Sequence, residues 1–269
     1  MLDRITPLLI TANEVTNIER TLAALDWAQE IVVVDSGSSD GTLDLLRSNR
    51  RVHVVERKFD SAARQLQFGL KHAGVSTDWV LALDADHVLT PAIIDEMGNL
   101  EPEPETSGYR AGFIYCIRGQ RLRGSLYPPR IVLFRKDRGG FKDDGHTQRI
   151  LVEGTSGDLK GKILHDDRKP IARWLASQTR YSRLEAAKLE ATPPSRLTMV
   201  NRIRRLGFLA PLLVLPYCLF LKGCILDGRA GWSYAFQRTI AEALLSVRVL
   251  ERRLTTETPD SELERGERH

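Results

Sequence analysis

The sequence predicts an α/β fold in which a mostly parallel sheet carries helices on both faces and is followed by a helical C-terminal appendage. Two observations lead to this prediction. Apolar runs of strand length alternate with helical patterns over the first hundred residues, which is the order of a parallel sheet joined by crossover helices. The run EIVVVDSG is apolar almost throughout, as is typical of a strand buried on both faces.

Each element follows from a local pattern. The apolar runs predict strands at residues 5–11, 31–35, 52–57 and 79–84, and the stretches between them predict helices near residues 17–25, 41–48, 62–73 and 91–100. After the acidic linker NLEPEPETSG we expect strands at residues 109–117 and 131–135 and another that ends at KILHDD. A helix over residues 171–191 stops before Pro193 and Pro194, because proline cannot continue a helix.

Composition and charge exclude some classes of protein. The chain has 269 residues, 42% of them hydrophobic, and its formal net charge of +4 is too small to indicate a nucleic-acid partner. Its three cysteines, Cys116, Cys218 and Cys224, show neither a disulfide framework nor metal-ligand spacing, which fits a reducing, cytoplasmic compartment. The start, MLDRITPLLITANE, lacks the long apolar run of a signal peptide, so we expect no secretion.

Polar side chains follow three of the predicted strands where each strand ends. LLITANE supplies Thr11 and Glu14, IVVVDSGSSDGT supplies Asp35, and LALDAD supplies Asp84 and Asp86. The carboxyl ends of parallel strands meet at one edge of a sheet, where ligands bind. Asp84 and Asp86 project to the same side of an extended chain, and two such carboxylates can hold a divalent cation. An acid that merely ends a strand is the alternative, but three polar strand ends favour a binding site.

Seven pieces of the sequence, in their order, resemble family 2 glycosyltransferases with the GT-A fold, and within them the lipopolysaccharide core β-1,4-glucosyltransferase-like group. The pieces are LLITANEVTNIERTL, EIVVVDSGSSDGT, DWVLALDAD, YPPRIVLFRKDRGGF, ILHDD, RYSRLEAAKL and LKGCILDGRAGWSYAF. Their order is more specific than any single piece, and the resemblance extends to about Leu254. It implies a nucleotide-sugar donor, usually UDP-linked, and Mg²⁺ or Mn²⁺ as the cofactor.

The resemblance also implies roles for individual residues. In it the nucleotide contacts are Thr11, Glu14, Asp35 and Asp84, with Asp84 toward the ribose or the metal, and the metal ligands are Asp86 and His165. On sequence alone a single histidine at a strand end is more often structural, so the role of His165 depends on the resemblance. Arg130 and Arg135 either help to hold phosphate or an anionic acceptor, or are solvent-facing charges on a strand edge.

One position departs from the family pattern. Close relatives tend to carry a His-Glu pair after the phenylalanine strand, whereas this chain reads DDGHTQ, with Thr147 where the acid would fall. Threonine cannot accept a proton from a sugar hydroxyl at neutral pH. Either Asp143 or Asp144 therefore acts as the catalytic base from a shifted position, with Asp144 preferred, or the chain is weakened or inactive as a transferase.

The C-terminal part has the composition of a membrane-associating segment. Residues 206–221 are uncharged, but they are shorter than a spanning helix and contain Pro211 and Pro216. Residues 196–222 include five basic residues and no acidic one. We expect an in-plane or re-entrant anchor on an anionic membrane surface; a core hairpin or a dimer contact is the alternative. An amphipathic helix is expected from Trp232, and the tail TTETPDSELERGERH is expected to be disordered.

These patterns predict an inverting glycosyltransferase, peripheral on the cytoplasmic face of the membrane, with a lipid-linked or lipopolysaccharide acceptor. The expected divisions are a GT-A catalytic domain over residues 1–170, a helical membrane-associating region over residues 171–254 and a disordered tail over residues 255–269. A polyprenyl-phosphate sugar synthase with the same donor site is one alternative, and a non-catalytic sugar-nucleotide-binding subunit of a membrane complex is another. A homo-oligomer is compatible with the sequence.

Overall fold

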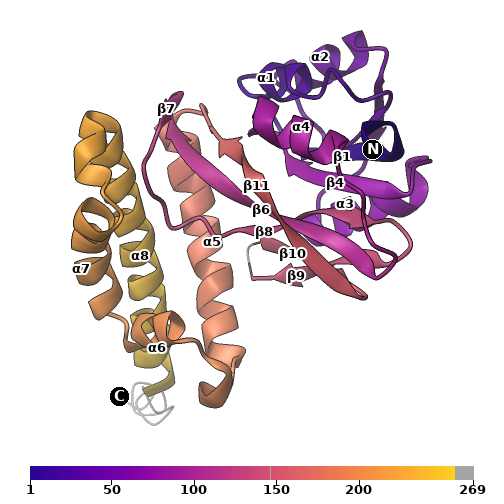
Figure 1. Ribbon diagram of the computed structural model, residues 1–269. Coiled ribbons are helices and arrows are strands. Elements are labelled where there is room, and N and C mark those ends of the chain that lie inside the picture. Colours follow the sequence, from indigo (N-terminus) through magenta and orange to yellow (C-terminus); the bar gives the residue numbers. More distant parts are fainter. Residues whose placement is uncertain (146, 258–269) are drawn as a thin grey trace, which may run out of the picture. The chain divides into compact units, whose positions relative to one another are not determined.

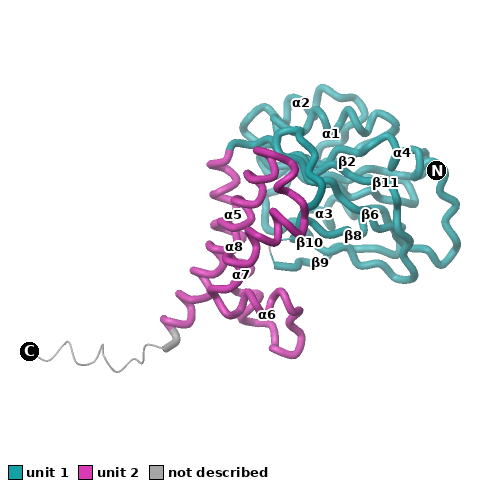
Figure 2. The backbone as a smooth tube through the Cα atoms, turned by 60° about the vertical axis from the view of Figure 1, so that its left-hand side comes forward, with its two compact units in different colours: residues 1–170 teal, residues 171–269 magenta. Residues whose placement is uncertain are grey.

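The computed structural model describes residues 1–145 and 147–257, and the chain forms two compact units (Figures 1 and 2). Unit 1 comprises residues 1–170 and contains every strand among the described residues, whereas unit 2, residues 171–269, is helical in its described part. The candidate site residues predicted from the sequence all belong to unit 1.

The sheet of unit 1 is mixed and mostly parallel, as the sequence predicts. Its parallel half has the order β3 (Val52–Glu56), β2 (Ile31–Asp35), β1 (Ile5–Thr11) and β4 (Trp79–Asp84). It continues through β8 (Arg130–Arg135), β6 (Thr106–Ile117), β11 (Thr155–His165) and β5 (His87–Leu89), and β7 (Gln120–Arg121) pairs with β6. Strand β8 is antiparallel to β4 and to β6, so β6 and its parallel neighbour β11 run in the direction of the first four strands.

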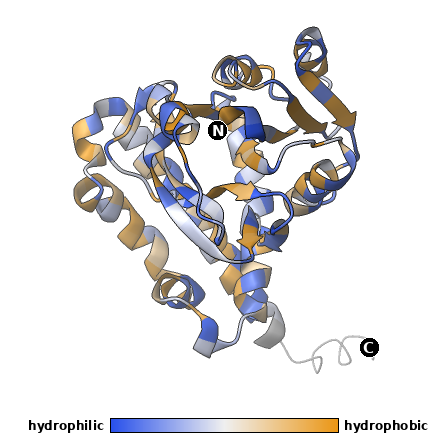
Figure 3. Ribbon diagram, turned by 45° about the vertical axis from the view of Figure 1, so that its right-hand side comes forward, coloured by the Kyte–Doolittle hydropathy of each residue, from blue (hydrophilic) through white to orange (hydrophobic). Residues whose placement is uncertain are grey.

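Both faces of the sheet are covered, because successive residues of a strand point to opposite sides. Leu8 of β1 packs toward the face covered by α3 (Ala62–His72), together with Leu66 of that helix. The next residue, Leu9, packs with the residues of three helices on the other face: α1 (Ile18–Ala23), α2 (Thr42–Ser48) and α4 (Pro91–Gly98). Figure 3 shows strands in the interior of the fold in orange, the hydrophobic end of the hydropathy scale.

A short β-hairpin packs on the same face as α3. It consists of β9 (Gly139–Asp144) and β10 (Thr147–Val152), which form a separate two-stranded antiparallel sheet among the described residues. Phe141 and Ile150 of the hairpin pack against the apolar cluster under α3, and the backbone N–H of Phe141 donates to Gln67 Oε1 of α3 at 3.1 Å. The sequence analysis assigned no element here, because GGFKDD lacks the alternation of apolar and polar residues that marks a strand.

Unit 2 is built around one long helix, α8 (Gly228–Glu257), which begins four residues before the expected Trp232. Three helices pack on it: α5 (Ile171–Ala191), α6 (Met199–Leu206) and α7 (Leu209–Pro216). A partly buried ion pair joins α6 to α8, with Arg204 Nε donating to Glu242 Oε2 at 2.9 Å. The first three residues of the expected tail continue α8, and residues 258–269 lie outside the described residues.

The apolar segment of unit 2 is broken into short pieces. Pro216 ends α7, a π-helical turn η3 (Tyr217–Leu221) follows, and η4 (Cys224–Asp227) leads into α8. Within residues 1–145 and 147–257, no single helix is long and apolar enough to cross a membrane. By length and composition alone, one bent pair passes that test together: Leu209–Leu221 and Cys224–Thr255, which meet at 70°.

Candidate active site

The predicted site residues lie along one edge of the sheet in unit 1. The last residues of β1, β2, β4 and β11 are Thr11, Asp35, Asp84 and His165. Because β8 runs in the opposite direction, its first residue, Arg130, lies at this same edge. Arg135 ends β8 at the opposite edge, where it pairs with Trp79 and its guanidinium lies 4.9 Å from the Trp79 ring centre. The prediction that Arg135 contacts phosphate in this site is therefore wrong.

Two carboxylates and two imidazoles lie close together at the carboxyl end of β4. Nε2 of His165 lies 3.3 Å from Oδ2 of Asp86. Nε2 of His87 lies 3.5 Å from Oδ2 of Asp84 and 4.0 Å from Oδ1 of Asp86. His87 and His165 are directly opposite in the β5–β11 pair, with ring centres 5.2 Å apart. The structure thus brings together the three predicted residues Asp84, Asp86 and His165 and adds His87 to them.

His87 was missed because alternation along an extended chain would place residue 87 on the face opposite to Asp84 and Asp86. The chain turns at residues 85–86 and β5 runs back along β11, so the His87 side chain returns to the acid pair. The available signal was its position immediately after two acids. Its side chain is 0% exposed.

Burial and opposite charge act against each other on these groups. Burial alone would raise the pKa of Asp86, but the attraction of His165 outweighs it and holds the pKa of Asp86 well below its ordinary range. Burial alone would lower the pKa of His165, but the attraction of Asp86 raises it. At His87 burial dominates and lowers the pKa to about 4. Asp86 is therefore ionised, His165 favours its protonated form and His87 is neutral.

The donor set fits Mg²⁺ or Mn²⁺. Two ligands at adjacent corners of an octahedron, with bonds near 2.1 Å, lie about 3 Å apart, which is close to the 3.3 Å between Asp86 Oδ2 and His165 Nε2. A carboxylate oxygen suits both ions, and an imidazole nitrogen is compatible with Mn²⁺. Among the described residues, Asp86, His87 and His165 form a group whose potential ligand atoms lie within 4.8 Å of one another.

Arg130 balances the charge of Asp84. One guanidinium nitrogen of Arg130 donates to Asp84 Oδ2 at 2.8 Å. The guanidinium carbon lies 5.3 Å from the ring centres of Phe113 and of Tyr127. The Tyr127 ring in turn stands edge-on to His165, with centres 4.5 Å apart. Aromatic rings therefore form a wall beside both the arginine and the imidazole.

Asp35 is enclosed by its own loop. Its Oδ1 accepts from the backbone N–H groups of Gly37 and Ser38 at 2.8 and 2.7 Å. Its Oδ2 accepts from the hydroxyls of Thr11 and Ser38 at 2.7 and 2.6 Å. A carboxylate offers about four acceptor positions, so those of Asp35 are filled within the protein. Thr11 and Asp35 therefore lie together, and in this structure they hold the loop DSGSSDGT.

Glu14 makes an ion pair across the edge. Lys169 Nζ donates to Glu14 Oε1 at 2.5 Å, and Asn17 Nδ2 donates to Glu14 Oε2 at 2.8 Å. Burial outweighs the attraction of Lys169 and raises the pKa of Glu14, and the charge of Asp86 adds to that rise. The sequence analysis did not predict Lys169, which lies four residues after His165 in ILHDDRK and also lies 3.6 Å from Asp167 Oδ1.

The tip of the β9–β10 hairpin reaches the acid pair. Gln148 Nε2 lies 3.4 Å from Asp84 Oδ1. Asp143 is directly opposite Gln148 in the pair and shares its face, and Asp144 is opposite Thr147 on the other face. Asp144 Oδ2 accepts from Arg149 at 2.9 Å. The two acids therefore point to opposite sides of the hairpin, and the contact to Asp84 is made on the face of Asp143.

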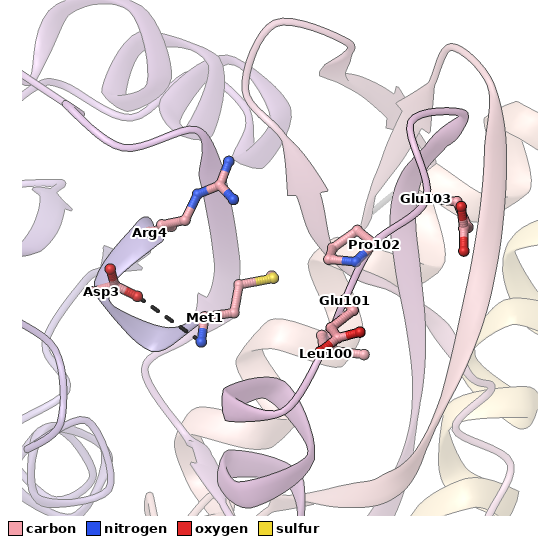
Figure 4. Close-up of a pocket in the computed structure, with 7 residues that line it drawn as sticks. All are labelled: Met1, Asp3, Arg4, Leu100, Glu101, Pro102 and Glu103. Carbon is pink, nitrogen blue, oxygen red and sulfur yellow. Dashed lines mark ion pairs between the residues drawn. The ribbon is translucent and has the colours of Figure 1, made fainter.

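A pocket lies at a different place in unit 1, lined by residues before β1 and after α4: Met1, Asp3, Arg4, Leu100, Glu101, Pro102 and Glu103 (Figure 4). Because β1 begins at Ile5, this pocket lies at the amino end of that strand, opposite to the acid pair. An ion pair of 3.9 Å between the Met1 amino group and Asp3 lies at its rim. The catalytic candidates are not among its lining residues.

Comparisons with known proteins relate the chain to several glycosyltransferases. The lipopolysaccharide core biosynthesis glycosyltransferase LpsC of Rhizobium meliloti (strain 1021) is 28% identical over 191 residues, which are 66% of this chain and 68% of LpsC. An uncharacterized glycosyltransferase of Rickettsia bellii (strain RML369-C) is 32% identical over 95 residues, 35% of this chain and 31% of the relative. The crystal structure of S. aureus TarS 1–349 in complex with UDP-GlcNAc aligns with 94% of this chain and 92% of that chain, at 15% identity and a TM-score of 0.47.

The family match covers most of the strands that carry the site, but it ends before β11 and His165. Residues 8–148 match the family described as Glycosyl transferase family 2. The matched segment is more than half of the 269 residues and includes Thr11, Asp35, Asp84 and Asp86. The chain therefore belongs to glycosyl transferase family 2 and is a glycosyltransferase.

Proposed function

We propose that this chain is an inverting, metal-dependent glycosyltransferase that moves a sugar from a nucleotide donor, a UDP-sugar, to a lipid-linked or lipopolysaccharide acceptor at the cytoplasmic face of the membrane. The observation that carries the proposal is the proximity of Asp84, Asp86 and His165 at the carboxyl edge of the sheet in a chain of family 2. The similarity to LpsC supports a lipopolysaccharide acceptor.

In this proposal Asp86 and His165 hold Mg²⁺ or Mn²⁺, which when bound supplies a Lewis acid for the diphosphate leaving group. Asp84 uses one oxygen for Arg130 and presents the other toward Gln148, where it can accept from a ribose hydroxyl of the donor. Arg130 adds positive charge beside the acids, and a guanidinium binds phosphate oxygens well. These groups bind and orient the donor diphosphate at the strand ends.

The nucleotide side of the site is assigned to Thr11, Glu14 and Asp35. Thr11 and Asp35 shape the pocket through the loop that they hold, because their side chains already bond to each other and to that loop. Glu14 is the nucleotide contact of this group, and its ion pair with Lys169 fixes its position. Lys169 also lies within reach of the charge of Asp86, so it adds to the positive charge around the diphosphate.

The base of the proposed reaction is Asp144. An inverting transfer needs a base that takes a proton from the acceptor hydroxyl as that hydroxyl attacks. The Gln148 contact to Asp84 puts the hairpin tip beside the donor site, and Asp144 is near that tip. Thr147, opposite Asp144, donates its hydroxyl to the Asp144 carbonyl at 3.0 Å and so acts in the turn.

The membrane contact is assigned to the broken helical segment of unit 2. Large apolar side chains are exposed along it: Leu212 69%, Phe220 65%, Leu221 74% and Leu226 66%. Basic residues flank the segment and no acid occurs between residues 196 and 222. Apolar side chains beside basic ones are typical of helices that lie in the interface of an anionic membrane.

The donor is tested by titrating a panel of UDP-, GDP- and TDP-sugars, each with Mn²⁺ and with EDTA, and by measuring binding and sugar transfer. Tight binding of a UDP-sugar only in the presence of Mn²⁺ is expected. Equal binding or transfer in EDTA would contradict the metal-dependent site. Partition of the labelled product into organic solvent, with or without mild acid hydrolysis, separates a lipopolysaccharide product from a polyprenyl-phosphate sugar.

The membrane contact is tested with liposomes. Phe220→Glu in the full chain should reduce binding to anionic vesicles, whereas Val247→Glu, an equally exposed position on α8 at 62%, serves as the matched control. Binding should weaken with salt, because charges are screened over about 8 Å at physiological ionic strength. Equal binding of both variants and the wild type would remove the segment from the membrane contact.

A further inference from the structure

His87 occupies a fully enclosed position between the two acids. It is the first residue of β5, its side chain is 0% exposed, and its ring centre lies 5.0 Å from that of Phe113 and 5.2 Å from that of His165. The group formed by Asp86, His87 and His165 resembles a set of three metal ligands by distance alone. Whether His87 is one of them depends on which ring nitrogen has a free lone pair.

The hydrogen bonds of His87 determine that nitrogen. The backbone N–H of Asp84 donates to Nδ1 of His87 at 3.1 Å. Nδ1 therefore carries no hydrogen and its lone pair is used, so the one hydrogen of the ring is on Nε2. Neither nitrogen has a lone pair left for a cation. For Nε2 to bind a cation the hydrogen would have to move to Nδ1, where it would face the N–H of Asp84.

Nε2 of His87 faces both acids and Arg130. It lies 3.5 Å from Asp84 Oδ2, 4.0 Å from Asp86 Oδ1 and 3.4 Å from a guanidinium nitrogen of Arg130. The bond from the Asp84 backbone to Nδ1 is shorter, and its donor is fixed in the chain whereas the Arg130 side chain can turn, so the backbone bond decides the tautomer. Asp86 then has its other oxygen, Oδ2, on the side of His165 at 3.3 Å. In contrast to His87, Nδ1 of His165 has no hydrogen-bond partner within the described residues, so no donor opposes a hydrogen on this nitrogen when Nε2 binds a cation.

We infer that His87 is a positioning residue and not a metal ligand. Its Nε2–H attracts the near oxygens of Asp84 and Asp86 electrostatically and so favours the orientation of Asp86 in which Oδ2 faces His165. His165 is then the one imidazole ligand of the cation. The assignment of the cation rests on the proposed function, whereas the tautomer of His87 does not depend on it.

The tautomer is tested on the wild-type protein without any metal. In protein with ¹⁵N-labelled histidine, two-bond proton–nitrogen correlations distinguish a protonated Nε2 from a protonated Nδ1, and the signals of His87 are assigned by their loss in His87→Gln. A protonated Nε2 and an unprotonated Nδ1 are expected at pH 7. A protonated Nδ1 would overturn the inference, whether or not the protein binds a cation.

The ligand count is tested by electron spin echo spectroscopy of bound Mn²⁺, which detects directly coordinated imidazole nitrogens. The wild type should show one such nitrogen, His87→Gln should keep it, and His165→Gln should lose it. Two imidazole nitrogens in the wild type, or loss of the signal in His87→Gln alone, would overturn the inference. Failure of the wild type to bind Mn²⁺ contradicts the proposed function and leaves the tautomer result to decide the role of His87.

The positioning role is tested by rescue. His87→Leu removes the N–H and should weaken Mn²⁺ binding about 10 to 100-fold, the usual cost of losing a partner of a metal ligand. His87→Gln puts an amide N–H near the place of Nε2 and should restore most of that affinity. If His87 only filled space in the core, His87→Leu should keep more Mn²⁺ affinity than His87→Gln, because leucine is the more apolar side chain. Tighter Mn²⁺ binding by His87→Leu than by His87→Gln would therefore contradict the inference.

Discussion

Strands β2 and β4 both end on aspartate at the same edge of the sheet, yet the two ends differ in how their charges are balanced. Asp35, 0% exposed, accepts four hydrogen bonds from neutral groups, two of them backbone N–H groups of its own loop. Asp84 and Asp86 instead face the basic side chains Arg130 and His165. The attraction of Arg130 lowers the pKa of Asp84 although burial and the charge of Asp86 would raise it.

The difference separates an acid that holds the loop of the site, Asp35, from acids that are available to a ligand, Asp84 and Asp86. Bonds to fixed backbone donors cannot be exchanged without reshaping the loop, so Asp35 belongs to the scaffold. A side-chain partner such as His165 can release its proton and make room for a cation, because metal binding and proton release are coupled. The same substitution at the two strand ends should therefore damage different properties of the protein.

The largest effect is expected at Asp86. Asp86→Ala should abolish metal-dependent transfer, at least about 10³-fold, because it removes a carboxylate ligand and with it the stabilised leaving group. The midpoint of thermal unfolding should change little, since the residue lies in the turn after the apolar strand. The exposed acid Asp137, 76% exposed near the opposite edge, provides the control Asp137→Ala, which should keep full activity. Wild-type activity in Asp86→Ala would contradict the metal site.

The next effect concerns the two acids of the hairpin. A positioned carboxylate base usually contributes about 10² to 10⁴-fold. We expect Asp144→Asn to lower turnover by this order with nearly constant nucleotide affinity, and Asp143→Asn, whose carboxylate accepts from Ser61 at 3.0 Å, to do much less. Turnover at saturating donor and acceptor measures both. A larger loss of turnover in Asp143→Asn than in Asp144→Asn would assign the base to Asp143, on the hairpin face that carries Gln148.

The parts predicted correctly from the sequence are those that a long apolar run specifies. The ends of β1, β2 and β4 follow from runs buried on both faces, and the strand ends place Asp84 and Asp86. Strand β5 has three residues, too few for any periodicity, so neither it nor the position of His87 was predictable.

Contacts between distant residues were likewise hidden. Lys169 meets Glu14 across 155 positions of sequence, and no local pattern links them. Two of the four donors to Asp35 are backbone N–H groups, which the sequence does not display, so these bonds emerge only from the loop geometry.

A third effect concerns the contribution of Asp35, at the end of β2, to the stability of the fold. Asp35→Ala removes four hydrogen bonds to a buried carboxylate, and bonds to charged groups contribute about 1.5 to 3 kcal/mol each before water replaces some of them, so a loss of about 3 kcal/mol in the free energy of unfolding is expected. Chemical denaturation of the wild type, Asp35→Ala and Asp86→Ala measures it. If Asp35→Ala lost no more free energy of unfolding than Asp86→Ala, the proposed difference between the ends of β2 and β4 would be contradicted.

The smallest effect is the pH dependence of the acid pair. The pKa of His165 is raised above its ordinary value of 6.5 by the attraction of Asp86, so protonation of His165 stabilises the metal-free fold fully below about pH 6.5, and this contribution is lost as the pH rises through the raised pKa. Mn²⁺ needs the deprotonated ring, so its affinity should rise about tenfold per pH unit below that pKa and level off above it.

Calorimetric titration of Mn²⁺ between pH 6 and 9, with thermal unfolding of the metal-free protein over the same range, measures both trends. They should run in opposite directions in the wild type, with stability falling and Mn²⁺ affinity rising as the pH increases. His165→Gln should flatten both, because glutamine carries no proton to lose. At the β2 end, Asp35→Ala should keep the slope of the Mn²⁺ affinity, since the bonds of Asp35 do not include His165. A slope that survives in His165→Gln would place the titrating group elsewhere and remove His165 from the proposed metal ligands.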